Sequence, residues 1–153
     1  MISTTSKYGI KSVCYLAQQP ESRFVAIREI SDELDIPFQY LTKLLQRLQQ
    51  GGIIYSRRGN TGGVSLARPA EEITLAEILN VLEPGFEKCS CLLHDELCMK
   101  TGNCPFGKYW GEIQNRLHDL LNNTDVKWIT SNSTEGSPIT DATTGKKATY
   151  INK

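Results

Sequence analysis

The chain has 153 residues and a mass of 17.1 kDa, and its 39% hydrophobic and 22% charged residues exclude a fibrous or wholly disordered protein. No apolar run approaches the roughly 20 residues of a membrane span, and the N-terminus lacks the apolar core of a secretory signal. Charges balance over the whole chain, yet residues 1–70 carry nine Lys and Arg against five Asp and Glu, whereas residues 71–130 carry five against ten. A basic first half indicates that this half faces a polyanion such as nucleic acid.

Three short helices are predicted within the first fifty residues. Apolar side chains recur at helical spacing over residues 10–17, 27–34 and 38–48. The turn Asp35-Ile36-Pro37 precedes the third helix, and Gly51-Gly52 ends it. The polar face of this third helix carries no acidic residue and consists of Gln39, Thr42, Lys43, Gln46 and Arg47. Three helices joined by tight turns are typical of a helix-turn-helix bundle, and its third helix is predicted to enter the major groove, where Gln39, Thr42 and Lys43 can reach base edges.

Two strand-like runs follow, at residues 53–55 and 64–66. Between them lies Arg57-Arg58-Gly59-Asn60-Thr61-Gly62-Gly63, a glycine-rich tip that predicts a hairpin with a longer loop. The alternative is a phosphate-cradling glycine loop, but no Gly-Lys-Ser/Thr follows and the next element is a strand. A hairpin directly after a helix-turn-helix is the wing of a winged helix, and the wing arginines Arg57 and Arg58 are therefore predicted to contact DNA.

The second half of the chain predicts two further helices. Thr74 and Glu77 have the spacing of a capping box, and Ile73 and Ile78 have that of a hydrophobic staple, which together predict a helix from Thr74 to about Glu83. After the cysteine-rich residues 86–104, Pro105 begins a long helix. Its apolar stripe, at steps of four and three, consists of Phe106, Trp110, Ile113, Leu117, Leu120 and Thr124. The stripe could pack on its own domain, but a helix this long on a small domain favours dimerisation.

The five cysteines fall into two groups. Cys14 lies on the apolar face of the first helix, where a free cysteine packs as a small hydrophobe. The other four have the spacing C-x-C-x6-C-x5-C, and they are Cys89, Cys91, Cys98 and Cys104. In a reducing cytoplasm such thiols are metal ligands or reactive groups rather than disulfides. The short knuckles of structural zinc sites are absent, so the spacing favours an iron–sulfur cluster, with zinc or a thiol switch as alternatives.

The chain resembles the Rrf-two superfamily of bacterial winged-helix regulators, in particular the cluster-binding branch that contains the IscR and NsrR repressors. The resemblance extends over about residues 1–128. The matching stretches are Ser6-Lys7-Tyr8-Gly9-Ile10, Ile36-Pro37-Phe38-Gln39-Tyr40-Leu41, Arg58-Gly59-Asn60-Thr61-Gly62-Gly63-Val64-Ser65-Leu66-Ala67-Arg68-Pro69 and Leu82-Glu83-Pro84. It implies a homodimer joined through the long helices, which carries a 2Fe–2S or 4Fe–4S cluster that controls its affinity for DNA.

The resemblance also implies the cluster ligands. Cys98 and Cys104 keep the five-residue gap of the family, and Cys91 fits the first ligand better than Cys89 does. The fourth ligand departs from the family: IscR-type members use a histidine where this chain has Gly107, and NsrR-type members use an aspartate where it has Lys7. The remaining candidates are Cys89, His94, Glu96 and an exogenous ligand.

The sequence thus predicts a mainly α-helical protein with a small β-hairpin wing and a long C-terminal dimerisation helix. Its expected parts are a DNA-binding domain over residues 1–84, a cluster-binding loop over 85–104, the dimerisation helix over 105–128 and a disordered tail over 129–153.

The expected function is a cytoplasmic repressor that binds an inverted-repeat operator in double-stranded DNA and does not bind membranes. Its cluster would sense iron or cluster status, nitric oxide or redox state. The alternative is a regulator of the same fold without a cluster, which senses cysteine oxidation, zinc or a partner protein. A thiol-dependent enzyme is disfavoured, because no Cys-His-Asn/Asp ordering or nucleophile elbow is visible.

Overall fold

The computed structural model describes residues 3–21, 23–59, 62–85 and 107–132. The described part is mainly α-helical with one two-stranded antiparallel sheet, which confirms the expected winged helix-turn-helix fold. Its elements are α1 (Thr4–Ala17), α2 (Ile27–Leu34), α3 (Phe38–Gln50), β1 (Ile54–Arg57), β2 (Gly63–Leu66), the 3-10 helix η1 (Ala70–Glu72), α4 (Leu75–Leu82), α6 (Gly107–Asn122) and α7 (Val126–Asn132). None of these helices is long and apolar enough to cross a membrane.

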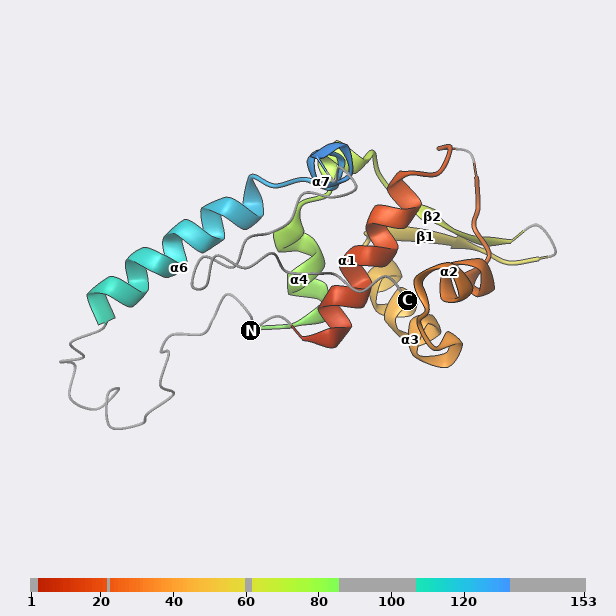
Figure 1. Cartoon of the computed structure of the whole chain (residues 1–153), viewed down its shortest axis with the longest axis horizontal. Helices are drawn as coiled ribbons and strands as arrows, with labels where there is room; N and C mark the ends of the chain where they lie inside the picture. Colours follow the sequence, from red (N-terminus) through yellow and green to blue (C-terminus); the bar gives the residue numbers. More distant parts are fainter. Residues whose placement is uncertain (1–2, 22, 60–61, 86–106, 133–153) are drawn as a thin grey trace, which may run out of the picture.

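The core lies where α1, α3 and α4 meet the base of the hairpin (Figure 1). It is formed by aliphatic side chains from almost every described element. The largest fully buried ones are Ile30, Ile36, Leu41, Leu45, Leu48, Ile53, Ile73, Ile78 and Leu79. The helical periodicity of the sequence therefore predicted the inward faces of α2 and α3, except at Phe38, which is exposed.

The turn between α2 and α3 is tight and well fixed. Asp35 ends α2 in the left-handed region with a φ of 50°, a conformation that Asp tolerates better than most residues. The next residue, Ile36, is buried, and its carbonyl oxygen accepts a 2.7 Å hydrogen bond from the Ser31 hydroxyl. Pro37 then precedes the first residue of α3. This turn directs α3 across the base of the domain with its polar face outward.

The wing rests on a contact that the sequence did not predict. Strands β1 and β2 pair from Ile54↔Leu66 to Arg57↔Gly63. On the other side of β2, Val25 and Val64 exchange two backbone hydrogen bonds of 2.9 Å. A Cβ atom at Gly63 would lie 2.4 Å from the Val25 carbonyl oxygen, so this close approach requires glycine. The link before α2 thus holds the first residues of β2, next to the loop of the wing.

The start of α4 follows the predicted capping box. The Thr74 hydroxyl accepts the Glu77 N–H at 3.3 Å, and the Glu77 carboxylate accepts the Thr74 N–H at 2.9 Å. Ile73 and Ile78, expected to form the hydrophobic staple, are both fully buried. The helix ends at Leu82, one residue before the expected end.

The predicted continuous helix over residues 105–128 is wrong at its C-terminal end. Helix α6 ends at Asn122, and α7 turns back to lie against α1 and η1 (Figure 1). The turn is held by the Val126 N–H, which donates to the Ile73 carbonyl at 2.9 Å, and by the Leu75 N–H, which donates to the Thr124 carbonyl at 2.9 Å. Residues 129–132 therefore belong to α7 rather than to a tail, and residues 133–153 lie outside the described part.

Candidate nucleic-acid interface

Helix α3 presents one apolar and one polar face. Leu41, Leu44, Leu45 and Leu48 are buried, whereas Gln39, Lys43, Gln46 and Gln50 are exposed. The exposed residues are spaced by four, three and four positions and therefore form one row along the helix. Lys43 makes no ion pair with any residue that the structure describes. This row can reach base edges in a groove.

Thr42, also predicted to contact DNA, lies beside this row and is half-buried. Its hydroxyl donates a 2.8 Å hydrogen bond to the Phe38 carbonyl one turn earlier. The hydroxyl hydrogen is thus used within the helix, whereas its oxygen lone pair and its methyl group can still meet a base.

Arg47 does not belong to this interface, although the sequence grouped it with the polar face of α3. Its Nη2 donates to the carbonyl oxygens of Val81 and Leu82, at 3.0 and 2.7 Å. These are carbonyls of the last turn of α4, which has no further helical partners for them, and a positive charge is favourable at that end. Arg47 therefore fixes α3 against α4.

The two wing arginines have different surroundings. The Arg57 guanidinium lies 4.2 Å from the ring centroid of Phe24, and Phe24 in turn meets Tyr55 edge-to-face at 6.0 Å. Arg58 is exposed and forms no ion pair with a described residue. The aromatic pair thus holds Arg57 beside the link that precedes α2, whereas Arg58 carries its charge at the tip, next to residues 60–61 outside the described part.

The first turn of α3 contains contacts that the sequence did not predict. The Tyr40 hydroxyl forms a hydrogen bond with the Thr5 hydroxyl, and its ring meets Tyr8 edge-to-face at 5.9 Å. Phe38, counted in the sequence as part of the apolar core stripe, is 40% exposed and carries the Arg28 guanidinium 4.9 Å from its ring centroid. The helical spacing within α3 gives no signal of this contact with α2.

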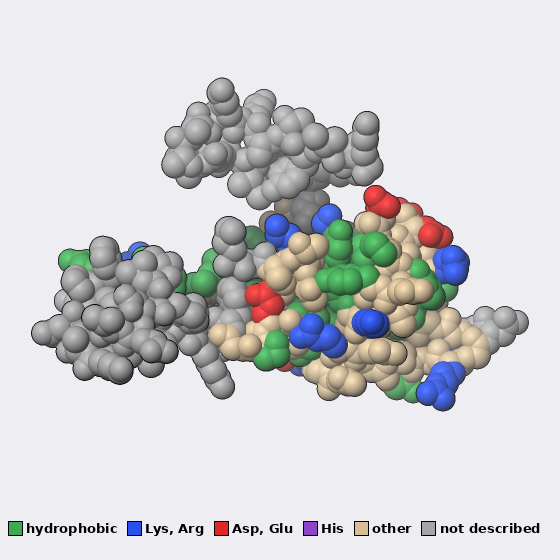
Figure 2. Space-filling model, turned by 90° about the horizontal axis from the view of Figure 1, so that it is seen from below, with side chains coloured by type: hydrophobic (Ala, Val, Ile, Leu, Met, Phe, Trp, Pro, Cys, Tyr) green, Lys and Arg blue, Asp and Glu red, His purple; other side chains and the backbone are tan. Residues whose placement is uncertain are grey.

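Figure 2 shows the molecule from below, with the side of α3 toward the viewer. Lys and Arg side chains are spread over this face, whereas the acidic ones lie nearer its edges. A polyanion approaching α3 and the wing would therefore meet a field of mainly positive sign.

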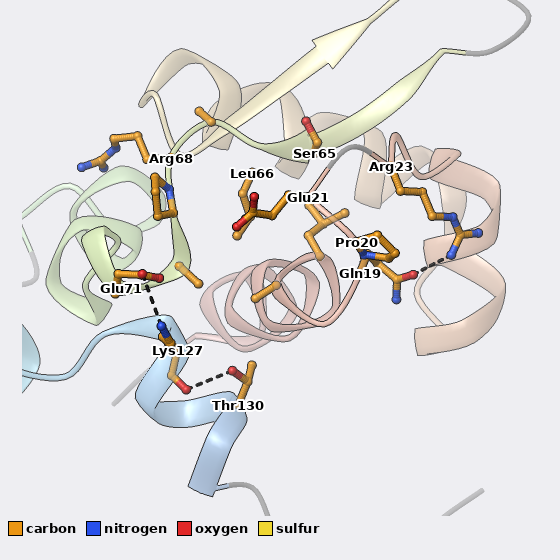
Figure 3. Close-up of a pocket in the computed structure, with 15 residues that line it drawn as sticks. Gln19, Pro20, Glu21, Arg23, Ser65, Leu66, Arg68, Glu71, Lys127 and Thr130 are labelled. Carbon is orange, nitrogen blue, oxygen red and sulfur yellow. Dashed lines mark hydrogen bonds and ion pairs between the residues drawn. The ribbon is translucent and has the colours of Figure 1, made fainter.

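A hollow on the other side of the domain, between α1, β2, η1 and α7, has a volume of about 400 Å³ (Figure 3). Three of its charged side chains, Arg68, Glu71 and Lys127, form ion pairs. Lys127 Nζ lies 3.3 Å from Glu71 Oε1, and Arg68 Nη2 lies 2.9 Å from Glu77 Oε1. These residues lie away from α3 and do not contribute to the basic face.

The candidate cluster ligands Cys89, Cys91, Cys98 and Cys104 lie outside the described residues, as do His94 and Glu96. The described ranges themselves bring no three His, Cys, Asp or Glu side chains together in a way that could hold a metal ion. Cys14 has a free thiol that packs partly buried against the core, as expected. Burial raises the pKa of the Cys14 thiol to about 11, so it stays protonated at neutral pH and is a poor ligand.

Comparison with known proteins identifies the family. The model of the Rrf2 (Rrf-two) family, described as iron-dependent transcriptional regulators, matches residues 2–132. The chain belongs to the Rrf2 family. The Rrf2 proteins are transcriptional regulators with a DNA-binding winged helix and are not enzymes, which agrees with the exposed row of α3 and the wing described above.

Three similar proteins illustrate the range of the family. A candidate HTH-type transcriptional regulator of Aquifex aeolicus (strain VF5) is 29% identical over 129 residues, which cover 83% of this chain and 89% of that protein. The structure of CymR, the global cysteine regulator of B. subtilis, has a TM-score of 0.72 at 24% identity and covers 88% of this chain and 98% of its own. The structure of T. potens IscR has a TM-score of 0.68 at 23% identity, with 88% and 89% covered. The two structures share the fold with this chain.

The exposed charge of Arg58 leads to a prediction about salt dependence. If Arg58 contacts a phosphate, Arg58→Ala should weaken operator binding and reduce the slope of log affinity against log salt by about one. Substitution of Lys43 should instead change sequence preference, because base contacts carry specificity. Fluorescence anisotropy over a salt series measures both, and unchanged operator affinity in Arg58→Ala would contradict the docking of the wing on DNA.

Proposed function

We propose that this Rrf2 protein is a cytoplasmic transcriptional repressor whose operator affinity is set by an iron–sulfur cluster that the cysteines of residues 89–104 bind. The observation that carries the proposal is the group of four cysteines within sixteen residues, in a family described as iron-dependent. Thiolates are the soft ligands that iron–sulfur clusters require, so the donor set fits either a 2Fe–2S or a 4Fe–4S cluster.

Cys91, Cys98 and Cys104 are the proposed protein ligands, and Cys89 is the first candidate for the fourth position. His94, Glu96 and an exogenous ligand are the alternatives, since Lys7 and Gly107 stand where relatives carry a ligand. The Lys7 side chain is exposed on α1, and an ammonium has no lone pair to donate to iron. The bound cluster would make operator affinity respond to a signal, because iron status, nitric oxide and oxidants all alter iron–thiolate bonds.

The described residues supply the DNA-binding part of this proposal. Helix α3 enters the major groove with Gln39, Thr42 and Lys43 toward the base edges. Arg57 and Arg58 of the wing contact phosphates or the adjacent minor groove, where narrow A·T-rich segments attract arginine. A two-fold homodimer would place its two α3 helices on half-sites about 34 Å apart and so read an inverted repeat.

The apolar stripe of α6 is the proposed dimer contact. Helix α6 extends away from the winged domain (Figure 1), and Ile113, Leu117 and Leu120 of the stripe are exposed along it, as is the neighbouring Tyr109. Trp110 and Thr124 are partly buried, and Phe106 lies outside the described residues. An apolar row this long on one helix is typical of a subunit interface. The cysteine segment, residues 89–104, comes just before α6 in the chain. A change in this segment can therefore alter how the two winged domains are placed in the dimer. A switch from 1:99 to 99:1 needs about 5.5 kcal/mol of differential affinity, which several iron–thiolate bonds can supply.

Iron and acid-labile sulfide in anaerobically purified protein test the proposal. We expect a brown protein with stoichiometric iron and sulfide and with visible absorbance that nitric oxide or air changes together with operator affinity. Wild-type protein that contains zinc or no metal, after growth with ample iron, would contradict the cluster. A winged-helix regulator that senses cysteine oxidation, zinc or a partner protein would then remain.

A further inference from the structure

The contact between Arg28 of α2 and Phe38 of α3 brings a cation to the start of the DNA-facing helix. The Arg28 Cζ atom lies 4.9 Å from the ring centroid of Phe38, which is within the range of a cation–π interaction. Phe38 is the first residue of α3 and is 40% exposed, and Arg28 is exposed as well. The pair therefore lies on the surface of the helix-turn-helix.

The charge of Arg28 is available to a ligand. Arg28 forms no ion pair with any carboxylate that the structure describes, although Glu29 beside it accepts a 2.7 Å ion pair from Arg23. The exposed position on α2 gives the guanidinium no structural task except the contact with Phe38. An aromatic ring under a guanidinium limits its rotamers and leaves its N–H edge free for hydrogen bonds.

The first turn of α3 provides a second reason to expect an anion here. Pro37 precedes α3 and has no side-chain acceptor, so the N-terminal N–H groups of α3 receive no side-chain cap. These groups and the positive end of the helix dipole favour a phosphate. Arg28 adds a full positive charge next to the same turn.

We propose that Arg28 binds a backbone phosphate of the operator at the point where α3 enters the major groove, and that Phe38 is the positioning residue that orients the guanidinium. The proposal deepens the proposed function: it rests on DNA binding through α3 and is independent of the cluster. A phosphate fits better than a base edge, because Arg28 is on α2, and the first helix of a helix-turn-helix crosses the DNA backbone.

The first test compares Arg28→Met with the wild type on a duplex that the wild-type chain selects from a random library. Arg28→Met keeps an unbranched apolar side chain and removes the charge. We expect about a tenfold lower affinity near 0.1 M salt, as for the loss of a hydrogen bond to a charged group. The slope of log affinity against log salt should fall by about one, and the loss should be equal on the operator and on unrelated DNA.

Arg68→Met is the matched control. Arg68 is half-exposed beside the hollow on the far side of the domain (Figure 3), so its substitution changes the net charge equally without touching α2 or α3. Its salt slope should equal that of the wild type. A slope that falls equally in both variants would show an effect of net charge and would overturn the proposal.

The second test locates the phosphate and defines the role of Phe38. A neutral methylphosphonate replaces one backbone phosphate of the operator at a time. At one position per half-site, this replacement should weaken binding by the wild type but should not further weaken binding by Arg28→Met. Phe38→Leu should lose less affinity than the wild type does when that same phosphate is neutralised. The double variant should bind the operator no more weakly than Arg28→Met does. Thermal unfolding of each variant confirms that it is folded.

The outcomes separate this inference from the proposed function. A wild-type chain that selects no DNA overturns both. A chain that binds its operator, with Arg28→Met unchanged in salt slope and still sensitive at every methylphosphonate position, overturns the phosphate contact alone. A loss in Arg28→Met that appears only at particular base pairs would assign Arg28 to a base edge, which also contradicts the proposal.

Discussion

Replacement of Cys98 or Cys104 by alanine should give a colourless protein even when the chain is made anaerobically with ample iron. Both cysteines keep the five-residue gap of cluster-binding Rrf2 proteins, and a cluster that loses one of three thiolate ligands has too few soft donors left. Cys91→Ala should have the same effect. Visible absorbance and iron and sulfide content measure the loss, which should be essentially complete.

Cys14→Ala is the matched control, because it also removes one thiol. Its thiol is partly buried against the core and has a pKa of about 11, so it exists as a neutral thiol at pH 7 and cannot act as a thiolate ligand. Cys14→Ala should therefore keep full colour. A loss of colour in Cys14→Ala equal to that in Cys98→Ala would show that the cysteines act through the fold rather than as ligands.

Cys89→Ala identifies the fourth ligand. If Cys89 is a ligand, its alanine variant should hold a cluster by three thiolates, with an altered spectrum and faster decay in air, since ligand type and solvent access tune such clusters. A variant that is indistinguishable from the wild type moves the assignment to His94, Glu96 or an exogenous ligand. The next substitutions are then His94→Ala and Glu96→Gln.

The sequence predicted those parts of the fold that local signals define. The leucine spacing of α3, the stop at Gly51 and the capping box of Thr74 and Glu77 depend on contacts within one or two turns, and the structure confirms all three. The wing was predicted from two strand-like runs on either side of a glycine-rich tip. Each of these signals lies within about fifteen consecutive residues, so a single sequence is sufficient to find it.

The features that the sequence missed all depend on residues far apart in the chain. The sequence places Arg47 on the exposed polar face of α3, and only the fold shows that the carbonyls of Val81 and Leu82 lie beside it. The pairing of Val25 with Val64 and the return of α7 onto Ile73 are likewise long-range backbone contacts. Phe38 shows the same limit, because helical spacing within α3 cannot show that Arg28 of α2 lies over its exposed ring.

The apolar stripe of α6 is exposed, whereas the leucine stripe of α3 is buried. Leu117 and Leu120 are 40% and 62% exposed, so α6 does not bury this stripe against the described part of its own subunit. The neighbouring Leu121 is only 6% exposed and packs against Ala76 and Leu79 of α4. One side of α6 thus joins the winged domain at its C-terminal end, and the other side carries the proposed contact with a second copy of the chain.

Leu120→Asp should therefore convert the dimer into a folded monomer. The aspartate costs little in the single subunit, where the side chain is exposed, but in the dimer it would bury a charge without a partner at a cost of several kcal/mol. Leu117→Asp should do the same. Sedimentation measures the mass, and thermal unfolding shows that the monomer keeps its fold. Operator affinity should fall strongly, because a monomer contacts only one half-site.

Leu121→Asp is the informative comparison, since it places the same charge one residue along the same helix. It should lower the midpoint of thermal unfolding, because it inserts a carboxylate between Ala76 and Leu79 and leaves it without a partner among these apolar side chains. A folded dimer in Leu120→Asp would contradict the α6 interface and place the subunit contact elsewhere. Equal loss of thermal stability in Leu120→Asp and Leu121→Asp would show that both faces of α6 stabilise the single subunit.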